Sequence, residues 1–308
     1  SIPISKEISL GLEEFGSTDK INAFIVRDPW DMTIPEGTTL RMTVYYGSNN
    51  DYFYMDRYVS ADMKLTGGMI YRMRFDNSKG QWIDPNYTST DKSMDGTICF
   101  AEQAKIQGAD IPLDIIFLGD GYTDQDMVQY KEDMNWMKDN LFKLEPFRSY
   151  KDYFNLYSIY AVSDNRKKIQ PLTNGANDLG GNTIFGAYFK QNETTILSND
   201  TNYSQAKSYA FKCINTVAGH DASSERKANL LIVIMINADC HAGTCHTSIP
   251  NSGKDYGEGV AIGYFARNSN EFMRWATFIH EAVGHGFGKL ADEYGGQTST
   301  NYTTAESK

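Results

Sequence analysis

The first third of the chain alternates apolar and polar positions with a period of two, which is typical of half-buried β-strands. Turn-forming Gly, Ser, Asn and Thr residues separate the alternating stretches. The clearest stretches lie at residues 22–26, 40–46 and 69–75. Short strands at this spacing predict an all-β, sandwich-like domain over residues 1–105. It gathers no cluster of His, Cys and carboxylate residues, so we assign it no chemistry.

From residue 106 onward, unbroken apolar runs alternate with segments of helical periodicity. Residues 113–119 and 229–236 are runs of the first kind and predict strands buried on both faces of an α/β sheet. Asp120 follows the first run and is predicted to form a turn or a helix cap in preference to a catalytic role. Thr123, Asp124 or Asp126 can cap the helix that follows. That helix ends near Leu141, and a long loop is expected at residues 163–188. Further helices are predicted at residues 204–217 and from about residue 270 onward.

The last of these helices carries the candidate chemistry. His280 and His285 lie five residues apart, and Glu281 directly follows the first of them. A zinc hydrolase needs nitrogen or carboxylate ligands, an open position for water and a base that activates this water. We therefore predict one Zn²⁺ ion with His280 and His285 as ligands and Glu281 as the catalytic general base.

The five-residue spacing is unusual for such a site. On a regular α-helix, residues i and i+5 point about 140° apart, whereas i and i+4 are only about 40° apart. Widening the helix to about 4.4 residues per turn brings the two imidazoles back to one side, and such π-type turns concentrate at functional sites. We predict a π-type irregularity at residues 281–285, made easier by Gly284.

The third metal ligand is expected beyond the helix. Gly288 is predicted to turn the chain back toward the metal, as the glycine does in related histidine-rich zinc motifs. Asp292 is our choice for the third ligand. Glu293 is the alternative. The carboxylate that does not bind the metal is expected to form a hydrogen bond with a metal ligand or to pair with a cation.

Two further features concern the surroundings of this site. Cys240 and Cys245 bracket a short loop that a disulfide can close, which would indicate an oxidising compartment; unpaired thiols are the alternative. A second metal site built with the adjacent His241 and His246 is less favoured than the disulfide. Gly263 and Tyr264 lie in a predicted strand that either forms the edge of the substrate cleft or is internal.

Length and charge narrow the class of protein. A chain of 308 residues favours two domains. The formal charge is 29 − 39 = −10 without basic runs, so nucleic acid is not an expected partner. No apolar run reaches the roughly 18–20 residues of a membrane span. The start at Ser1 predicts a processed or trimmed form, and the sequence does not indicate an oligomeric state.

Three segments resemble one known family. Residues 280–294 look like the metal-binding signature of the IgA-peptidase family of zinc metalloendopeptidases. Residues 118–123 and 145–150 look like two other recurrent segments of that family and occur in the same order. The resemblance covers residues 110–294, and residues 1–105 are similar in placement to the β-rich module that precedes many members.

The resemblance implies an α/β, zincin-type metallopeptidase domain over residues 106–308. It implies a secreted, periplasmic or cell-surface zinc endopeptidase that acts on protein or peptide substrates, with His280 and His285 as ligands and Glu281 as base. The alternative is a surface protein that binds glycan or host protein on a catalytically degraded peptidase scaffold. The extra residue in the helix and the chain's end soon after Tyr294 favour this alternative.

Overall fold

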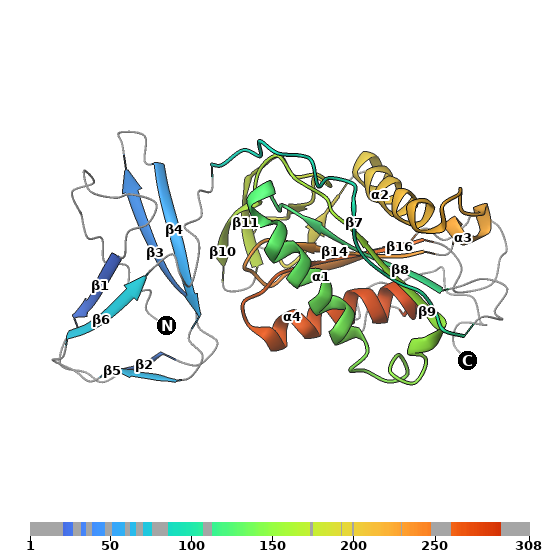
Figure 1. The fold of residues 1–308 in the computed structure, drawn as a ribbon. Coiled ribbons are helices and arrows are strands. Elements are labelled where there is room, and N and C mark those ends of the chain that lie inside the picture. Colours follow the sequence, from blue (N-terminus) through green and yellow to red (C-terminus); the bar gives the residue numbers. More distant parts are fainter. Residues whose placement is uncertain are drawn as a thin grey trace.

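The computed structural model describes short strands between residues 21 and 75 and, more fully, residues 86–106, 113–172, 175–191, 193–198, 200–228, 230–247 and 260–290 (Figure 1). The first strands are β1 (Ile21–Val26), β2 (Met32–Ile34), β3 (Thr39–Tyr46), β4 (Asp51–Tyr58), β5 (Met63–Leu65) and β6 (Ile70–Phe75). They form antiparallel pairs of β1 with β6, β2 with β5 and β3 with β4. The sandwich-like arrangement of these strands stays a prediction.

A six-stranded mixed sheet forms the centre of the second part. Its order is β15-β16-β14-β8-β9-β7. The four inner strands are parallel, and the two outer strands, β15 and β7, run antiparallel to their neighbours. The strands are β7 (Ile98–Glu102), β8 (Leu113–Asp120), β9 (Phe154–Ile159), β14 (Leu231–Ile236), β15 (Gly243–Thr247) and β16 (Ala261–Ala266). Strand β7 lies before residue 106 and pairs with β9 in this sheet, and the division into two domains stays a prediction.

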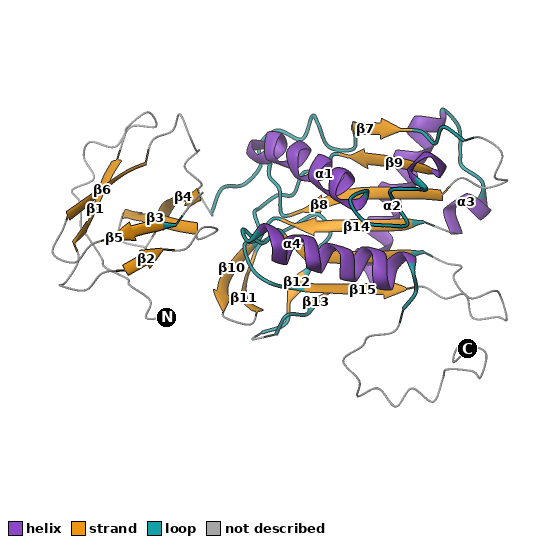
Figure 2. Ribbon diagram, turned by 90° about the horizontal axis from the view of Figure 1, so that it is seen from below, coloured by secondary structure: helices purple, strands orange, loops and turns teal. Residues whose placement is uncertain are grey.

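The inner strands form the core that the apolar runs predicted. Every residue of β14 is buried, and so is every residue of β8 after Leu113. Such strands need cover on both faces. Helices α1 (Met127–Leu141) and α4 (Glu271–Phe278) cover one face, and α2 (Asp200–Ala218) covers the other (Figures 1 and 2). A further short helix is α3 (Ser224–Ala228), and no described helix is long and apolar enough to cross a membrane.

Helix α1 has the predicted buried face, and two of the predicted caps, Thr123 and Asp126, stand at its start. Met127, Tyr130, Met134 and Met137 are buried as the periodicity required. The single-turn helix η1 (Asp124–Asp126) precedes α1, and the backbone N–H of Thr123 donates to Oδ2 of Asp126 at 2.9 Å. Asp120 is instead the last residue of β8, so its predicted role as a helix cap is wrong.

The Asp120 side chain binds residues 183–187, which lie in the segment predicted to be a long loop. Residues 163–188 contain a hairpin of β10 (Lys168–Leu172) and β11 (Gly175–Gly180), followed by the hairpin of β12 (Tyr188–Phe189) and β13 (Ile196–Leu197). The carboxylate of Asp120 is fully buried and accepts hydrogen bonds from Thr183 Oγ1, Phe185 N and Ala187 N at 3.0–3.2 Å. Burial raises the pKa of Asp120, which these three hydrogen bonds oppose.

Asp120 is therefore expected to stabilise the connection between the core and the hairpins. Asp120→Ala leaves three buried donors without an acceptor and is expected to lower the free energy of unfolding by about 3 kcal/mol, measured by urea denaturation. Asp152→Ala is the control, because it removes an exposed ion pair with Lys105 and should cost less than about 1 kcal/mol. Equal losses in the two variants would contradict this role.

Candidate metal centre

The helix that carries the histidines begins with a side-chain cap and is anchored to the sheet. The Asn270 side chain accepts a hydrogen bond from the backbone N–H of Met273 at 3.1 Å, as an N-cap residue does. At the other end of α4, Phe278 is fully buried and its ring lies 5.3 Å from that of Phe265 in β16. The chain then continues directly into η3 (Ile279–Phe287), which is a π-helix.

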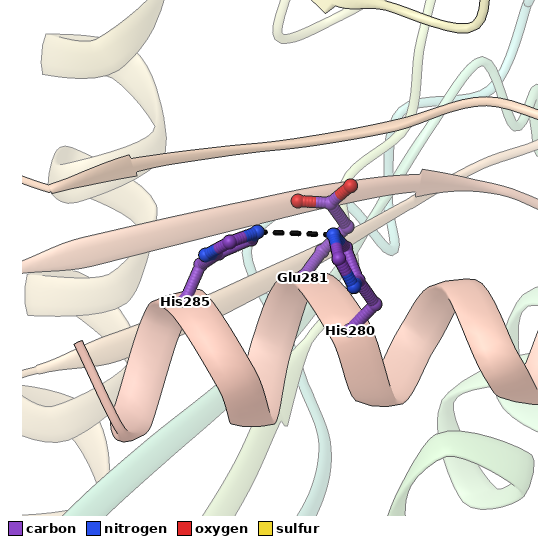
Figure 3. A group of neighbouring side chains, drawn as sticks. All are labelled: His280, Glu281 and His285. Atoms are coloured by element: carbon purple, nitrogen blue, oxygen red, sulfur yellow. Dashed lines mark hydrogen bonds between the residues drawn. The ribbon is translucent and has the colours of Figure 1, made fainter. Parts of the chain in front are cut away.

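The π-helix brings the two histidines together. Nε2 of His280 and Nε2 of His285 lie 3.0 Å apart, with the ring planes at 89° (Figure 3). At the end of the helix, the backbone N–H of Gly288 donates to the carbonyl of Val283, five residues back. The predicted π-type irregularity is thus confirmed. It brings together two side chains that a regular α-helix would direct about 140° apart.

The backbone after the helix sets the tautomer of His285. Lys289 adopts the left-handed conformation with φ of 50°, and the carbonyl of Leu290 lies 2.7 Å from Nδ1 of His285. A carbonyl oxygen only accepts hydrogen bonds, so Nδ1 carries the hydrogen and the neutral ring keeps its lone pair on Nε2. The turn predicted at Gly288 is made at Lys289, since Gly288 has a helical φ of −73°.

These donors fit a metal ion. Two ligand atoms at about 2.0–2.1 Å from a tetrahedral zinc lie about 3.3 Å from each other. The separation of 3.0 Å between the two Nε2 atoms is close to this value. A carboxylate oxygen of Glu281 completes a group whose atoms all lie within 4.8 Å of one another. The hydrogen bond from Nδ1 to a backbone carbonyl is also the usual support of a histidine ligand.

Glu281 is fixed by a close approach to the edge strand β15. Its side chain is buried, and a Cβ atom on Gly243 would lie 2.6 Å from Oε1 of Glu281. Only glycine leaves this space, because real Cβ atoms do not approach other atoms so closely. Cys245 lies two residues further along the same face, and burial raises the pKa of its thiol to about 12, with the nearby Glu281 adding to the rise. Cys245 is therefore a neutral thiol at neutral pH.

The structure decides between the alternatives for two features of the surroundings. Gly263 and Tyr264 lie in the internal strand β16, between β14 and β15, and among the described residues β15 is the outermost strand on this side of the sheet. Cys240 and Cys245 are free thiols, which contradicts the predicted disulfide. Cys245 lies within β15 and its sulfur faces Gly286 of the helix, whereas Cys240 lies in the connection before the strand.

The remaining candidates do not join the site among the described residues. His246 faces the side of β15 opposite Cys245 and packs on Tyr203, with ring centroids 4.7 Å apart. A second metal site that uses both Cys245 and His246 is thereby excluded. Asp292 and Glu293 lie outside the described residues.

Gly243 and Leu290 shape the site but lie outside the histidine and glutamate pattern of the sequence. Gly243 is a glycine inside a strand, a signal of close backbone approach that sequence reasoning can use. Leu290 acts through its backbone carbonyl, which no side-chain pattern reveals. Two glycines of η3, Gly284 and Gly286, differ in the space around them. A Cβ on Gly284 would make only an ordinary van der Waals contact, 3.9 Å from the carbonyl oxygen of Ile279, whereas one on Gly286 would lie 2.7 Å from Leu231 Cδ1.

Comparison with known families gives one match. The model of the family described as IgA Peptidase M64 matches residues 104–308. It therefore includes the described sheet from β8 onward and the whole π-helix. A comparison with curated proteins finds no match.

The two glycines of the π-helix are expected to respond oppositely to the same substitution. Gly284→Ala should raise the free energy of unfolding by about 0.5–1 kcal/mol, because alanine loses less conformational freedom on folding. Gly286→Ala should lower it by about 1–3 kcal/mol, because the added methyl overpacks against Leu231. Urea denaturation of both variants measures the difference. Destabilisation by Gly284→Ala would show that the helix needs a glycine at residue 284.

Proposed function

Since the chain belongs to the IgA peptidase M64 family of metallopeptidases, we propose that it is a zinc-dependent endopeptidase that hydrolyses peptide bonds of extracellular proteins. One observation carries this proposal. The Nε2 atoms of His280 and His285 lie 3.0 Å apart, with the Glu281 carboxylate beside them (Figure 3). Two imidazoles and an adjacent carboxylate are the donor set of a hydrolytic zinc site.

In this proposal one zinc ion is held by His280, His285 and Asp292, with Glu293 as the alternative third ligand. When bound, zinc polarises the carbonyl of the scissile bond and lowers the pKa of the attacking water. The Leu290 carbonyl orients the His285 ring through Nδ1 and leaves Nε2 as the donor atom. His280 presents its own Nε2 from the preceding turn of the π-helix.

Glu281 is proposed as the general base. It accepts a proton from the attacking water and later gives it to the leaving nitrogen of the cleaved peptide bond, so that acid and base are restored. Its position against Gly243 restricts the side chain to the side of the helix where the two histidines converge. This restriction supports catalysis, because a base held in place loses little freedom in the transition state.

Strand β15 is proposed to bind the substrate by adding a peptide strand to its edge. The N–H of Gly243 points outward from the sheet, because it donates to a residue beyond the edge and not to β16. Backbone groups alternate along a strand, so Cys245 and Thr247 also present N–H and C=O groups outward. This edge runs beside η3, so a bound peptide lies near Glu281.

The domain organisation and location belong to the same proposal. We propose a zincin-type catalytic domain preceded by a β-sandwich-like domain, in a secreted, periplasmic or cell-surface protein. The family match begins at residue 104, and β7 adds residues from Ile98 onward to the catalytic sheet. The strand pairs between residues 21 and 75 support a β-rich first domain. The location rests on the family resemblance.

The alternative of a degraded scaffold that binds glycan or host protein loses its main argument. It rested on the extra residue between His280 and His285, which would separate the imidazoles on a regular helix. The π-helix compensates for that residue. Metal content and activity still distinguish the two functions, as follows.

Glu281→Gln is expected to lower the rate of peptide hydrolysis by about 10²–10⁴-fold, because glutamine cannot accept the proton. The zinc content should stay near one ion per chain, because His280 and His285 are unchanged. Casein digestion with chelator and zinc-restored controls measures the activity, and elemental analysis measures the metal. Glu271→Gln is the matched control, since Glu271 is an exposed residue in the first turn of the same helix.

Two outcomes would contradict the proposed function. Full activity of Glu281→Gln would remove the proposed base. A wild-type protein that neither contains zinc nor takes it up, and that cleaves no casein before or after zinc addition, would support the degraded scaffold.

A further inference from the structure

The outer edge of β15 is already partly covered by the chain itself. The backbone N–H of Gly243 donates to the carbonyl of Thr194 at 2.9 Å, and Thr195 forms a parallel bridge with Gly243. Both threonines lie in the connection between β12 and β13, a hairpin that stands at the start of β15 (Figure 2). A peptide strand cannot pair with β15 at Gly243 while this connection occupies the position.

The covered end of β15 is the end next to the candidate base. Gly243 is the residue whose missing Cβ makes room for the Glu281 carboxylate. From there, β15 runs past Cys245 to Thr247 along the same side of the helix. The described residues place no further strand beyond β15 at Cys245 and Thr247. Within the described residues, the proposed substrate edge is thus closed at its Gly243 end and uncovered toward Thr247.

The hairpin is held in place on three sides. Phe189 and Ile196, which pair across the hairpin, are buried in the core. The Ile196 N–H also donates to Oγ1 of Thr244 in β15 at 3.0 Å. On its other side, Glu193 bridges to Ala176 in β11, and Gly175 permits this approach, because a Cβ there would lie 2.2 Å from the Glu193 carbonyl oxygen. These attachments hold residues 190–195 in place beside the edge of β15, and we call this segment the wall.

We propose that residues 190–195 close the edge of β15 at Gly243 and turn the substrate chain out of the plane of the sheet soon after the cleaved bond, so that few residues on that side pair with β15. This inference rests on the proposed function. Antiparallel pairing is the more stable arrangement for an added strand. A peptide antiparallel to β15 runs from Thr247 toward Gly243, so the residues that follow the cleaved bond meet the wall. Residues before the cleaved bond extend toward the open end.

The available length follows from strand geometry. A strand added to β15 lies about 4.8 Å from it and advances about 3.3 Å per residue. The Glu281 carboxylate lies beside Gly243, and residues 194 and 195 cover the outer edge of β15 at Gly243. The cleaved bond therefore lies close to the wall. The space therefore accepts roughly one or two residues after the cleaved bond before the extended chain must leave the plane of the sheet.

A variant with a shortened hairpin tests the wall. Residues 190–195 are replaced by Asn-Gly, which connects the paired residues Phe189 and Ile196 through a two-residue turn and keeps both in the core. A casein-derived peptide that the wild type cleaves is then lengthened residue by residue, either before or after the cleaved bond. Mass spectrometry of the products gives kcat/KM for each peptide.

For the wild type, kcat/KM should rise with residues added after the bond only up to about two residues, and further residues should change it by less than about twofold, because the chain has then left the edge of β15. In the shortened variant, a third and a fourth residue should raise kcat/KM further, by up to about tenfold. Thr244→Val, which removes the acceptor of the Ile196 N–H, should allow part of this further rise. Glu193→Gln is the control within the same loop, because it weakens only an exposed ion pair with Lys190 and should keep the wild-type profile.

Several results would overturn the inference. One is a wild type whose kcat/KM keeps rising with each of several residues added after the bond; another is a shortened variant that gains only on the side before the bond. Circular dichroism checks that the shortened variant is folded, and if it is not, an unchanged length profile in Thr244→Val overturns the inference. A wild type that cleaves no peptide would overturn the proposed function together with this inference.

Discussion

The approach of His280 and His285 depends on one constraint, the widened turn of a π-helix. A hydrogen-bonding pattern from residue i to i+5 places their Nε2 atoms 3.0 Å apart, where an α-helix would direct them to different sides. A π-helix is rarely stable by itself, so its surroundings must favour it. Here the sheet does so, since Gly286 packs directly on Leu231 and Gly263 allows the backbone at Ala282 to approach β16.

The same close packing connects the site to the edge strand. Because η3 lies so near the sheet, Glu281 reaches Gly243, and Gly243 in turn pairs with Thr194. One glycine of β15 therefore contacts both the candidate base and the hairpin that we propose as the end of the cleft. Because Gly243 lies next to both, the position of the hairpin limits how far a substrate bound at Glu281 can pair with β15.

Much of this architecture was predictable from local sequence patterns. The apolar run of β14 identified a buried strand, the periodicity of Met127, Tyr130 and Met134 identified α1, and the spacing of His280 and His285 required a π-type turn. What the local patterns left open or assigned wrongly depends on contacts between distant segments. Whether Gly263 lies at an edge depends on where β15 pairs, and the role of Asp120 depends on a loop some sixty residues later.

The measurement that tests the central claim most directly is anomalous diffraction at the zinc absorption edge from crystals grown with zinc. We expect one peak about 2.0–2.1 Å from Nε2 of both His280 and His285, with a carboxylate from Asp292 or Glu293 as the third ligand. The helix should keep its π geometry from Ile279 to Phe287. A zinc bound by only one of these histidines, or bound elsewhere while both remain in contact with each other, would contradict the account.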